Sequence, residues 1–146
     1  MNLPDVVFSK WTRWTARADL DRIDLPGVYI LAHFATPPPG NADPQAREVI
    51  YIGETCARTL KVRWDNFHKA AFDGGNNHSG GKKYRKDFGD NGGDLFVAAF
   101  PVDKLNDELC DELNNKLRPL FIRYVERKLI WEYAEKYLAA PKYNTK

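Results

Sequence analysis

Three stretches of the chain are predicted to be buried β-strands, because apolar and β-branched residues follow one another in them almost without interruption. They are residues 27–34 (GVYILAHF), 48–53 (EVIYIG) and 94–102 (DLFVAAFPV). The segment between the first two, residues 36–47, is dense in proline, glycine, asparagine and aspartate, which extend neither a strand nor a helix. The pattern therefore predicts a three-stranded sheet with a long loop after its first strand.

Helical spacing is found between and after these strands. Apolar positions recur every three or four residues in residues 60–72, and leucines recur every four residues in 103–115, so each segment is predicted to be a helix. Pro119 suits the first turn of a further, longer helix through residues 119–138. The apolar stripes are Leu60, Trp64, Phe67 and Ala71, then Leu105, Leu109 and Leu113, then Phe121, Val125 and Leu129. The order of elements predicts an α+β fold, with helices flanking a small, mainly antiparallel sheet.

Composition limits the chain to one core. With 146 residues, 43% of them hydrophobic, we expect a single domain in which residues 1–25 are an N-terminal extension and residues 26–144 are the core. Cys56 and Cys110 lie far apart and outside metal-binding spacings, which favours a reducing cytoplasm. No segment has the length and apolar character of a membrane span, so no membrane partner is expected. Trp11 and Trp14 are expected to cover one edge of the sheet.

Polar residues occupy the ends of the predicted elements. Tyr29 lies near the start of the first strand and Tyr51 near the end of the second, so antiparallel pairing would bring the two phenols together. Arg63 follows Gly53 by ten residues and lies in the first turns of the next helix. Glu126 lies in the last helix with isoleucines four residues before and after it, where an idle surface carboxylate is uncommon. These side chains are expected to converge.

The motifs resemble those of the GIY-YIG nucleases, a family found in restriction enzymes, intron-encoded homing endonucleases and bacterial excision-repair nucleases. GVY at residues 27–29 and YIG at 51–53 are similar to the motifs that name the family. LKVRW at 60–64 resembles its arginine-bearing helix, and ERKLIWEYAEKYLAAPKYN at 126–144 resembles its glutamate-bearing helix and terminal asparagine. The four motifs occur in the family's order and span roughly residues 26–144.

The resemblance implies an endonuclease that hydrolyses DNA phosphodiester bonds with one divalent metal ion, Mg²⁺ or Mn²⁺. A carboxylate suits such a hard cation, a guanidinium suits a phosphate oxygen, and a phenol near cations can act as a base. The implied site comprises Tyr29 as general base, Tyr51 to orient the phosphate, Arg63 to clamp it, Glu126 to bind the metal, His68 to relay a proton or contact phosphate, and Asn144 to anchor the site.

Basic residues follow the arginine-bearing helix. Residues 78–86 (HSGGKKYRK) concentrate lysine and arginine in a glycine-rich connection, which we expect to be a flexible loop along a DNA backbone. No DNA-reading module is recognisable, so target choice is expected to come from a homodimer or a separate partner. The residues expected to contact nucleic acid are Gly53, Lys61, Lys82, Lys83 and Arg85.

Two other functions fit the same pattern. A catalytically inactive relative would retain the scaffold and only bind nucleic acid, and the five-residue interval from Arg63 to His68, against the family's usual four, fits such a decayed site. A protein-interaction domain would instead use the tryptophans and the acidic residues of 103–112. Each site residue also has an ordinary role open to it, as a strand tyrosine or a solvated helix residue.

Overall fold

One antiparallel sheet organises the molecule, a computed structural model that describes residues 2–88 and 93–144. Within these residues the sheet has four strands in the order β1-β4-β2-β3. Along the chain the elements are β1 (Thr12–Arg13), the 3-10 helix η1 (Trp14–Asp19), β2 (Gly27–His33), β3 (Val49–Thr55), α1 (Leu60–Phe72), α2 (Ser79–Phe88), β4 (Leu95–Pro101) and α3 (Asp111–Tyr137). The α+β class is confirmed. The expected three strands are wrong, because the short β1 pairs with β4 as a fourth.

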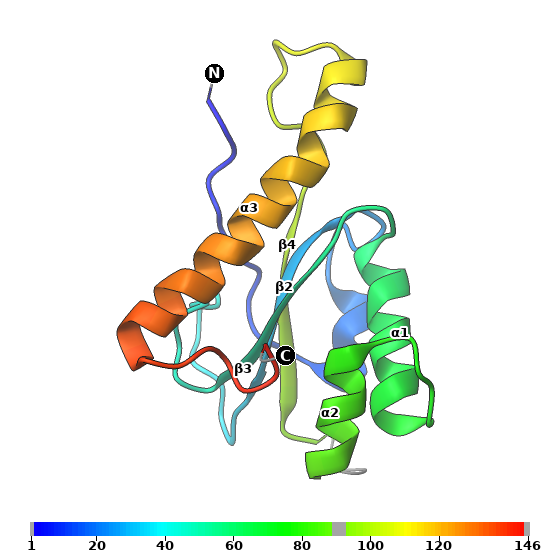
Figure 1. Cartoon of the computed structure of the whole chain (residues 1–146), viewed down its shortest axis with the longest axis vertical. Coiled ribbons are helices and arrows are strands. Elements are labelled where there is room, and N and C mark those ends of the chain that lie inside the picture. The colour runs from blue at the N-terminus through cyan, green and yellow to red at the C-terminus, as the bar shows by residue number, and fades with distance from the viewer. Residues whose placement is uncertain (1, 89–92, 145–146) are drawn as a thin grey trace.

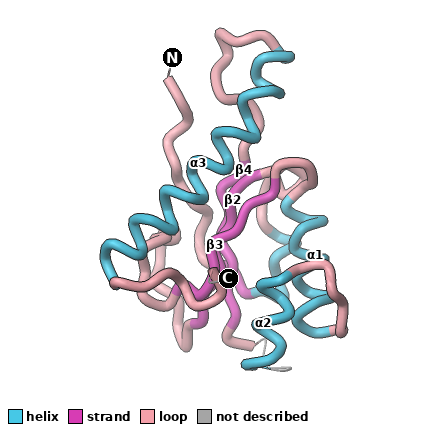
Figure 2. The backbone as a smooth tube through the Cα atoms, viewed as in Figure 1, coloured by secondary structure: helices cyan, strands magenta, loops and turns pink. Residues whose placement is uncertain are grey.

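The helices cover the two faces of the sheet separately (Figure 1). The long helix α3 packs on one face, and α1 with α2 packs on the other. The side chains of strand β2 alternate between the two faces of the sheet. Val28 and Ile30 therefore lie in the core under α3, whereas Tyr29 and Leu31 lie in the core under α1. Figure 2 shows the strands as the layer between these helices.

The segment before residue 26 belongs to the sheet and to both cores. Trp11 packs on Phe34 in the core under α3, and Trp14 packs on Trp64 in the core under α1. They flank β1, which pairs with β4 at one edge of the sheet. The two tryptophans therefore pack in the cores on opposite faces of the sheet, on either side of the strand that forms its edge.

Helix α1 has the predicted bounds. The Thr59 hydroxyl accepts a hydrogen bond from the Val62 backbone N–H at 3.2 Å and caps the helix. The predicted apolar stripe is buried against the sheet and α2.

Residues 79–88 form helix α2, so the prediction of a flexible loop over 78–86 is wrong. Its glycines serve packing rather than flexibility. A Cβ on Gly81 would lie 2.8 Å from the Ala70 Cβ and 2.9 Å from the Phe67 carbonyl oxygen, both on α1. Glycine thus lets the two helices touch backbone to backbone.

The two predicted C-terminal helices are a single helix that starts later. Residues 103–110 are not helical, because Asn114 ties them into a loop: its Oδ1 accepts from the Leu105 N–H at 2.9 Å, and its Nδ2 donates to the Leu109 carbonyl at 3.1 Å. Pro119 lies inside α3 rather than in the first turn of a new helix. Within the described residues, no helix combines the length and apolar composition needed to cross a bilayer.

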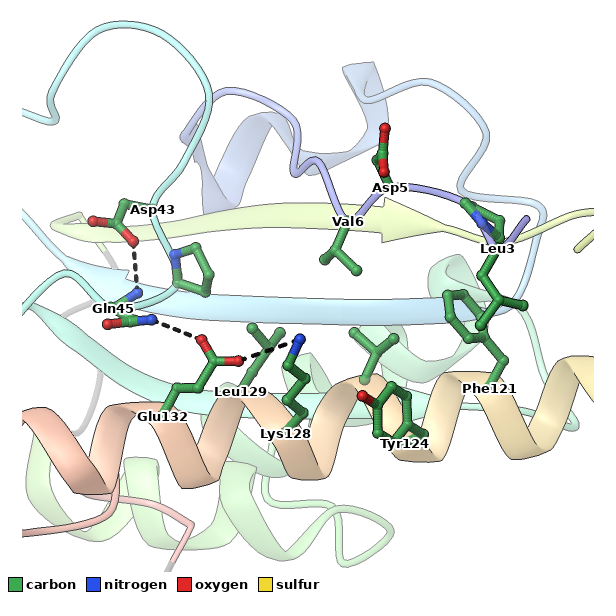
Figure 3. A pocket seen from close by; sticks show the side chains of 13 residues that line it. Leu3, Asp5, Val6, Asp43, Gln45, Phe121, Tyr124, Lys128, Leu129 and Glu132 are labelled. Carbon is green, nitrogen blue, oxygen red and sulfur yellow. Dashed lines mark hydrogen bonds and ion pairs between the residues drawn. The ribbon is translucent and has the colours of Figure 1, made fainter. Parts of the chain in front are cut away.

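The proline-rich loop between β2 and β3 is held against α3. Gln45 donates from Nε2 to Glu132 at 2.9 Å, and its carbonyl accepts from the Tyr137 hydroxyl at 2.5 Å. Figure 3 shows the hollow of about 490 Å³ between this loop, the N-terminal segment and α3, with Leu129 and Phe121 at its floor. The loop therefore contacts α3 and the N-terminal segment.

Candidate active site

Two phenols lie side by side on the face of the sheet covered by α1 and α2. Tyr29 is directly opposite Gly53 in the antiparallel pair of β2 with β3, and the Tyr29 and Tyr51 ring centroids are 6.0 Å apart. Tyr29 is fully buried, whereas Tyr51 is partly exposed. A Cβ on Gly53 would lie 2.5 Å from the Tyr51 ring and 2.7 Å from the Tyr29 Cζ. Gly53 thus leaves the space that both rings occupy.

Arg63 brings positive charge to both phenols. It lies in the first turn of α1, where its backbone N–H donates to the Thr59 carbonyl at 3.0 Å. Burial, and then the neighbouring Tyr51, raise the pKa of Tyr29 well above its ordinary value, while the charge and hydrogen bonding of Arg63 act to lower it. Burial also raises the pKa of Tyr51, and Arg63 again opposes the rise. The guanidinium is therefore positioned to favour a phenolate.

His78 joins this cluster although sequence reasoning did not select it. Its side chain is buried, and its Nε2 lies 2.8 Å from the Tyr29 hydroxyl. Its ring also packs edge-on against Phe67, with centroids 5.2 Å apart. No spacing rule points to His78, because it lies 49 residues from Tyr29 and reaches it only through the packing of α2 on α1.

Glu126 comes from α3, the helix on the opposite face of the sheet from the phenols, and approaches Tyr51 at the β3 edge. Helix α3 crosses this edge strand, and the charge of Glu126 raises the pKa of Tyr51. Burial, and then the nearby Glu54 carboxylate, raise the pKa of Glu126 above its ordinary value. A carboxylate that is desolvated beside a second carboxylate favours a cation or a proton as its partner.

An open groove, which we call the arginine groove, runs beside these residues. It has a volume of about 500 Å³, and three arginines reach it from three elements: Arg58 from the loop after β3, Arg63 from α1 and Arg123 from α3. The other lining residues are Glu54, Thr55, Cys56, Ala57 and Asn77. Arg123 precedes Glu126 by three residues and so shares its helix face, a signal that the sequence carried.

Asn144 holds the C-terminal segment against edge strand β3. It bonds to Ile52, the residue between Tyr51 and Gly53. Its Oδ1 accepts from the Ile52 N–H at 2.8 Å, and its Nδ2 donates to the Ile52 carbonyl at 2.7 Å. The adjacent Tyr143 N–H donates to the Ile50 carbonyl at 2.8 Å. The segment thus occupies backbone groups that an edge strand leaves unpaired.

No family model, curated protein or solved structure matches the chain. The candidate site therefore rests on its own geometry: a phenol pair, three arginines around a groove and a partly buried carboxylate at the edge strand.

His68 lies apart from this cluster. Its Nδ1 accepts from the Trp14 indole N–H at 3.1 Å, and its Nε2 lies 4.0 Å from Asp73. Five residues after Arg63 correspond to a rotation of roughly 140° around the helix, which turns the imidazole away from the guanidinium. The structure thus places His78, not His68, beside the phenols.

The predicted basic contacts lie outside the arginine groove. Lys61 is exposed in the first turn of α1, Lys82 is exposed on α2, and Lys83 and Arg85 are partly exposed on the same helix. Arg85 lies against Gly74, with 3.2 Å between its Nη1 and a Cβ built there. These residues are therefore separate from the arginine groove, with Lys61 on α1 and the other three on α2.

The available donors suit a hydrated divalent cation better than a closed metal cage. In residues 2–88 and 93–144, no three His, Cys, Asp or Glu side chains gather as a metal-binding group. Glu126 and Glu54 are two neighbouring carboxylates, and Mg²⁺ is usually bound through one or two carboxylates with water and phosphate oxygens completing its shell. The residues present fit such an ion.

Proposed function

We propose that this protein is an endonuclease of the GIY-YIG type that hydrolyses DNA phosphodiester bonds with one Mg²⁺ or Mn²⁺ ion. The observation that carries the proposal is the arginine groove, which opens beside two phenols and a partly buried carboxylate. Cys56 and Cys110 are both free thiols, which supports action in a reducing cytoplasm.

The groove matches the charge of a nucleic-acid backbone. Guanidinium groups stay charged and bind phosphate oxygens through a planar fork, so Arg58, Arg63 and Arg123 provide sites for successive or shared phosphates. Glu54 and Glu126 would repel the same phosphates unless a cation lies between. This combination favours a phosphodiester bound together with a metal ion over an anion bound alone.

Glu126, with Glu54 beside it, would hold the ion. A bound Mg²⁺ or Mn²⁺ supplies positive charge to the phosphate and to the oxygen that leaves. Arg63 adds positive charge next to both phenols, which favours the phenolate needed to accept a proton from water. Burial keeps both phenols protonated in the free protein, so the base forms only when further positive charge enters the site.

Nicking of supercoiled plasmid tests the proposal. The wild type should nick with Mg²⁺ or Mn²⁺ and be inactive with EDTA, and Tyr51→Phe, Arg63→Ala and Glu126→Ala should each slow nicking by about 10²-fold or more. Arg22→Ala is the matched control, because Arg22 is an exposed arginine that pairs with Asp103 at 3.6 Å and does not line the groove.

Two results would contradict the proposal. Nicking that survives Glu126→Ala at the wild-type rate would point to a contaminating nuclease. Binding without cleavage of supercoiled, linear and branched DNA by the wild type would favour the alternative of an inactive nucleic-acid-binding module.

A further inference from the structure

His78 is a buried polar residue whose two ring nitrogens both have partners. It is 1% exposed and lies immediately before α2. Its Nδ1 accepts a hydrogen bond from the Gly81 backbone N–H at 3.1 Å, in the manner of a helix N-cap. Its Nε2 contacts the Tyr29 hydroxyl at 2.8 Å. The imidazole therefore links the start of a helix to a phenol of the site.

The hydrogen bond at Nδ1 of His78 determines which atom donates in the hydrogen bond at Nε2. A backbone N–H can only donate, so Nδ1 of His78 carries no proton, and the single proton of the neutral ring is on Nε2. Burial, and then the charge of Arg63, lower the pKa of His78 to about 3, so the ring is neutral at physiological pH. Nε2 must then donate to the Tyr29 oxygen.

This donation constrains the hydroxyl of Tyr29. Its oxygen accepts from His78 and lies within hydrogen-bonding reach of Arg63, so its own proton must point elsewhere. Hydrogen bonding between Tyr29 and Tyr51 contributes to the pKa of both phenols, raising that of Tyr29 and lowering that of Tyr51. With His78 donating to the Tyr29 oxygen, the Tyr29 proton is left for the neighbouring Tyr51, whose ring centroid is 6.0 Å from that of Tyr29.

Packing holds the imidazole in this place. A Cβ on Gly80 would lie 3.1 Å from the Tyr51 ring and 3.1 Å from the His78 Cε1, so the start of α2 closes directly over the site. Gly81 in turn touches the backbone of α1 at Phe67. Since Tyr29 is fully buried and Tyr51 is not, Tyr51 is the phenol that a substrate can reach.

We propose that His78 is a positioning residue of the nuclease site: it fixes Tyr29 as a hydrogen-bond donor to Tyr51 and so leaves Tyr51 as the phenol that meets the substrate. This inference rests on the proposed function and reverses the roles expected for the two tyrosines. The charged and titratable groups facing the phenol pair are His78 before α2, Arg63 on α1, Glu54 on β3 and Glu126 on α3.

Two substitutions separate the two contacts of His78. In His78→Asn the shorter amide can still cap α2 in the place of Nδ1 but does not reach Tyr29. In His78→Gln the longer amide can donate to Tyr29 in the place of Nε2 but does not cap. We expect His78→Asn to unfold near the wild-type denaturant midpoint and to nick at least tenfold more slowly. His78→Gln should unfold at a lower midpoint and nick within threefold of wild type.

The opposite ranking of activities, or equal nicking by His78→Asn and wild type, would overturn the inference. Imidazole ¹⁵N NMR of the wild type gives a readout that does not depend on cleavage: the Nε2–H tautomer of His78 is expected from pH 5 to 8. If the wild type cleaves no DNA, the proposed function fails, and this spectrum alone decides the hydrogen-bond direction. An Nδ1–H tautomer would then refute it.

Discussion

Gly53 lies directly across the β2–β3 pair from Tyr29, and the ring of Tyr29 folds over it. A Cβ built on Gly53 would come within 2.8 Å of the Tyr29 hydroxyl oxygen and 2.5 Å of the Tyr51 ring. The absence of a side chain at Gly53 therefore determines the positions that both phenol rings can occupy.

Gly53→Ala should destabilise the fold and displace the phenols. Overpacking of a filled site costs about 1–3 kcal/mol, and here a strand backbone prevents easy relief. Urea unfolding of Gly53→Ala and wild type measures the loss. Gly93→Ala is the matched control, since a Cβ there meets nothing within 4 Å, and it should stay within about 0.5 kcal/mol of wild type. Equal midpoints for Gly53→Ala and wild type would contradict the close contacts.

Glu126→Gln should raise stability at neutral pH while it abolishes nicking. Burial raises the pKa of Glu126 in the folded chain, so the folded state binds its proton more tightly than the unfolded state. Stability therefore falls as pH rises from the unfolded pKa through the folded pKa, and above both values the ionised carboxylate costs stability in full. The advantage of Glu126→Gln should be present at pH 7 and vanish below about pH 4.

Unfolding midpoints across this pH range give the measurement. Glu112→Gln is the control, because Glu112 forms an exposed pair with Lys116 at 3.3 Å and its removal should change little at any pH. A Glu126→Gln variant that is less stable than wild type at pH 7 would show that the carboxylate has a compensating partner.

Divalent metal should stabilise the wild type through Glu126. A ligand present at ten times its dissociation constant adds about 1.4 kcal/mol to the unfolding free energy. Thermal unfolding with increasing Mg²⁺ or Mn²⁺ should show a rising midpoint that EDTA reverses. Glu126→Gln should show no such rise, and an equal rise in both proteins would place the metal elsewhere.

Arg58→Ala and Arg123→Ala should weaken DNA binding and flatten its salt dependence. Each lost phosphate contact lowers the slope of log K against log salt concentration by about 1. Fluorescence anisotropy with Mg²⁺ present, on variants that also carry Tyr51→Phe, measures binding without cleavage. Arg22→Ala should keep the wild-type slope, because Arg22 does not line the arginine groove. Unchanged slopes for both groove variants would remove the groove from the binding surface.

Cys56 should resist alkylation in the folded protein. Burial, and then a hydrogen bond to Glu54, raise the pKa of the Cys56 thiol to about 12, which leaves a thiolate fraction on the order of 10⁻⁴ at pH 8. Cys110 is exposed, so iodoacetamide should modify it first. Peptide mass spectrometry with and without urea gives both rates. If Cys56 and Cys110 were alkylated at comparable rates in the folded protein, the Cys56 thiol would not be held against Glu54.

The reliable part of the sequence reasoning concerned local patterns. The strand pair that joins Tyr29 and Tyr51, and the apolar stripe and bounds of α1, follow from periodicities of two and about 3.6 residues. The errors arose where distant contacts override local preference. Gly80 and Gly81 suggest a loop, yet their missing side chains let α2 pack on α1. The leucines of 103–110 suggest a helix, yet Asn114 ties their backbone into a loop.

The chain by itself therefore determined the α+β class, the strand pair and the residue types of the candidate site, because these depend on neighbours close in sequence. Only the tertiary structure brought His78 to Tyr29, turned His68 toward Trp14, and gathered Arg58, Arg63 and Arg123 around one groove. Those relationships depend on how α2 and α3 pack against the sheet. The spacing of side chains along the sequence does not determine that packing.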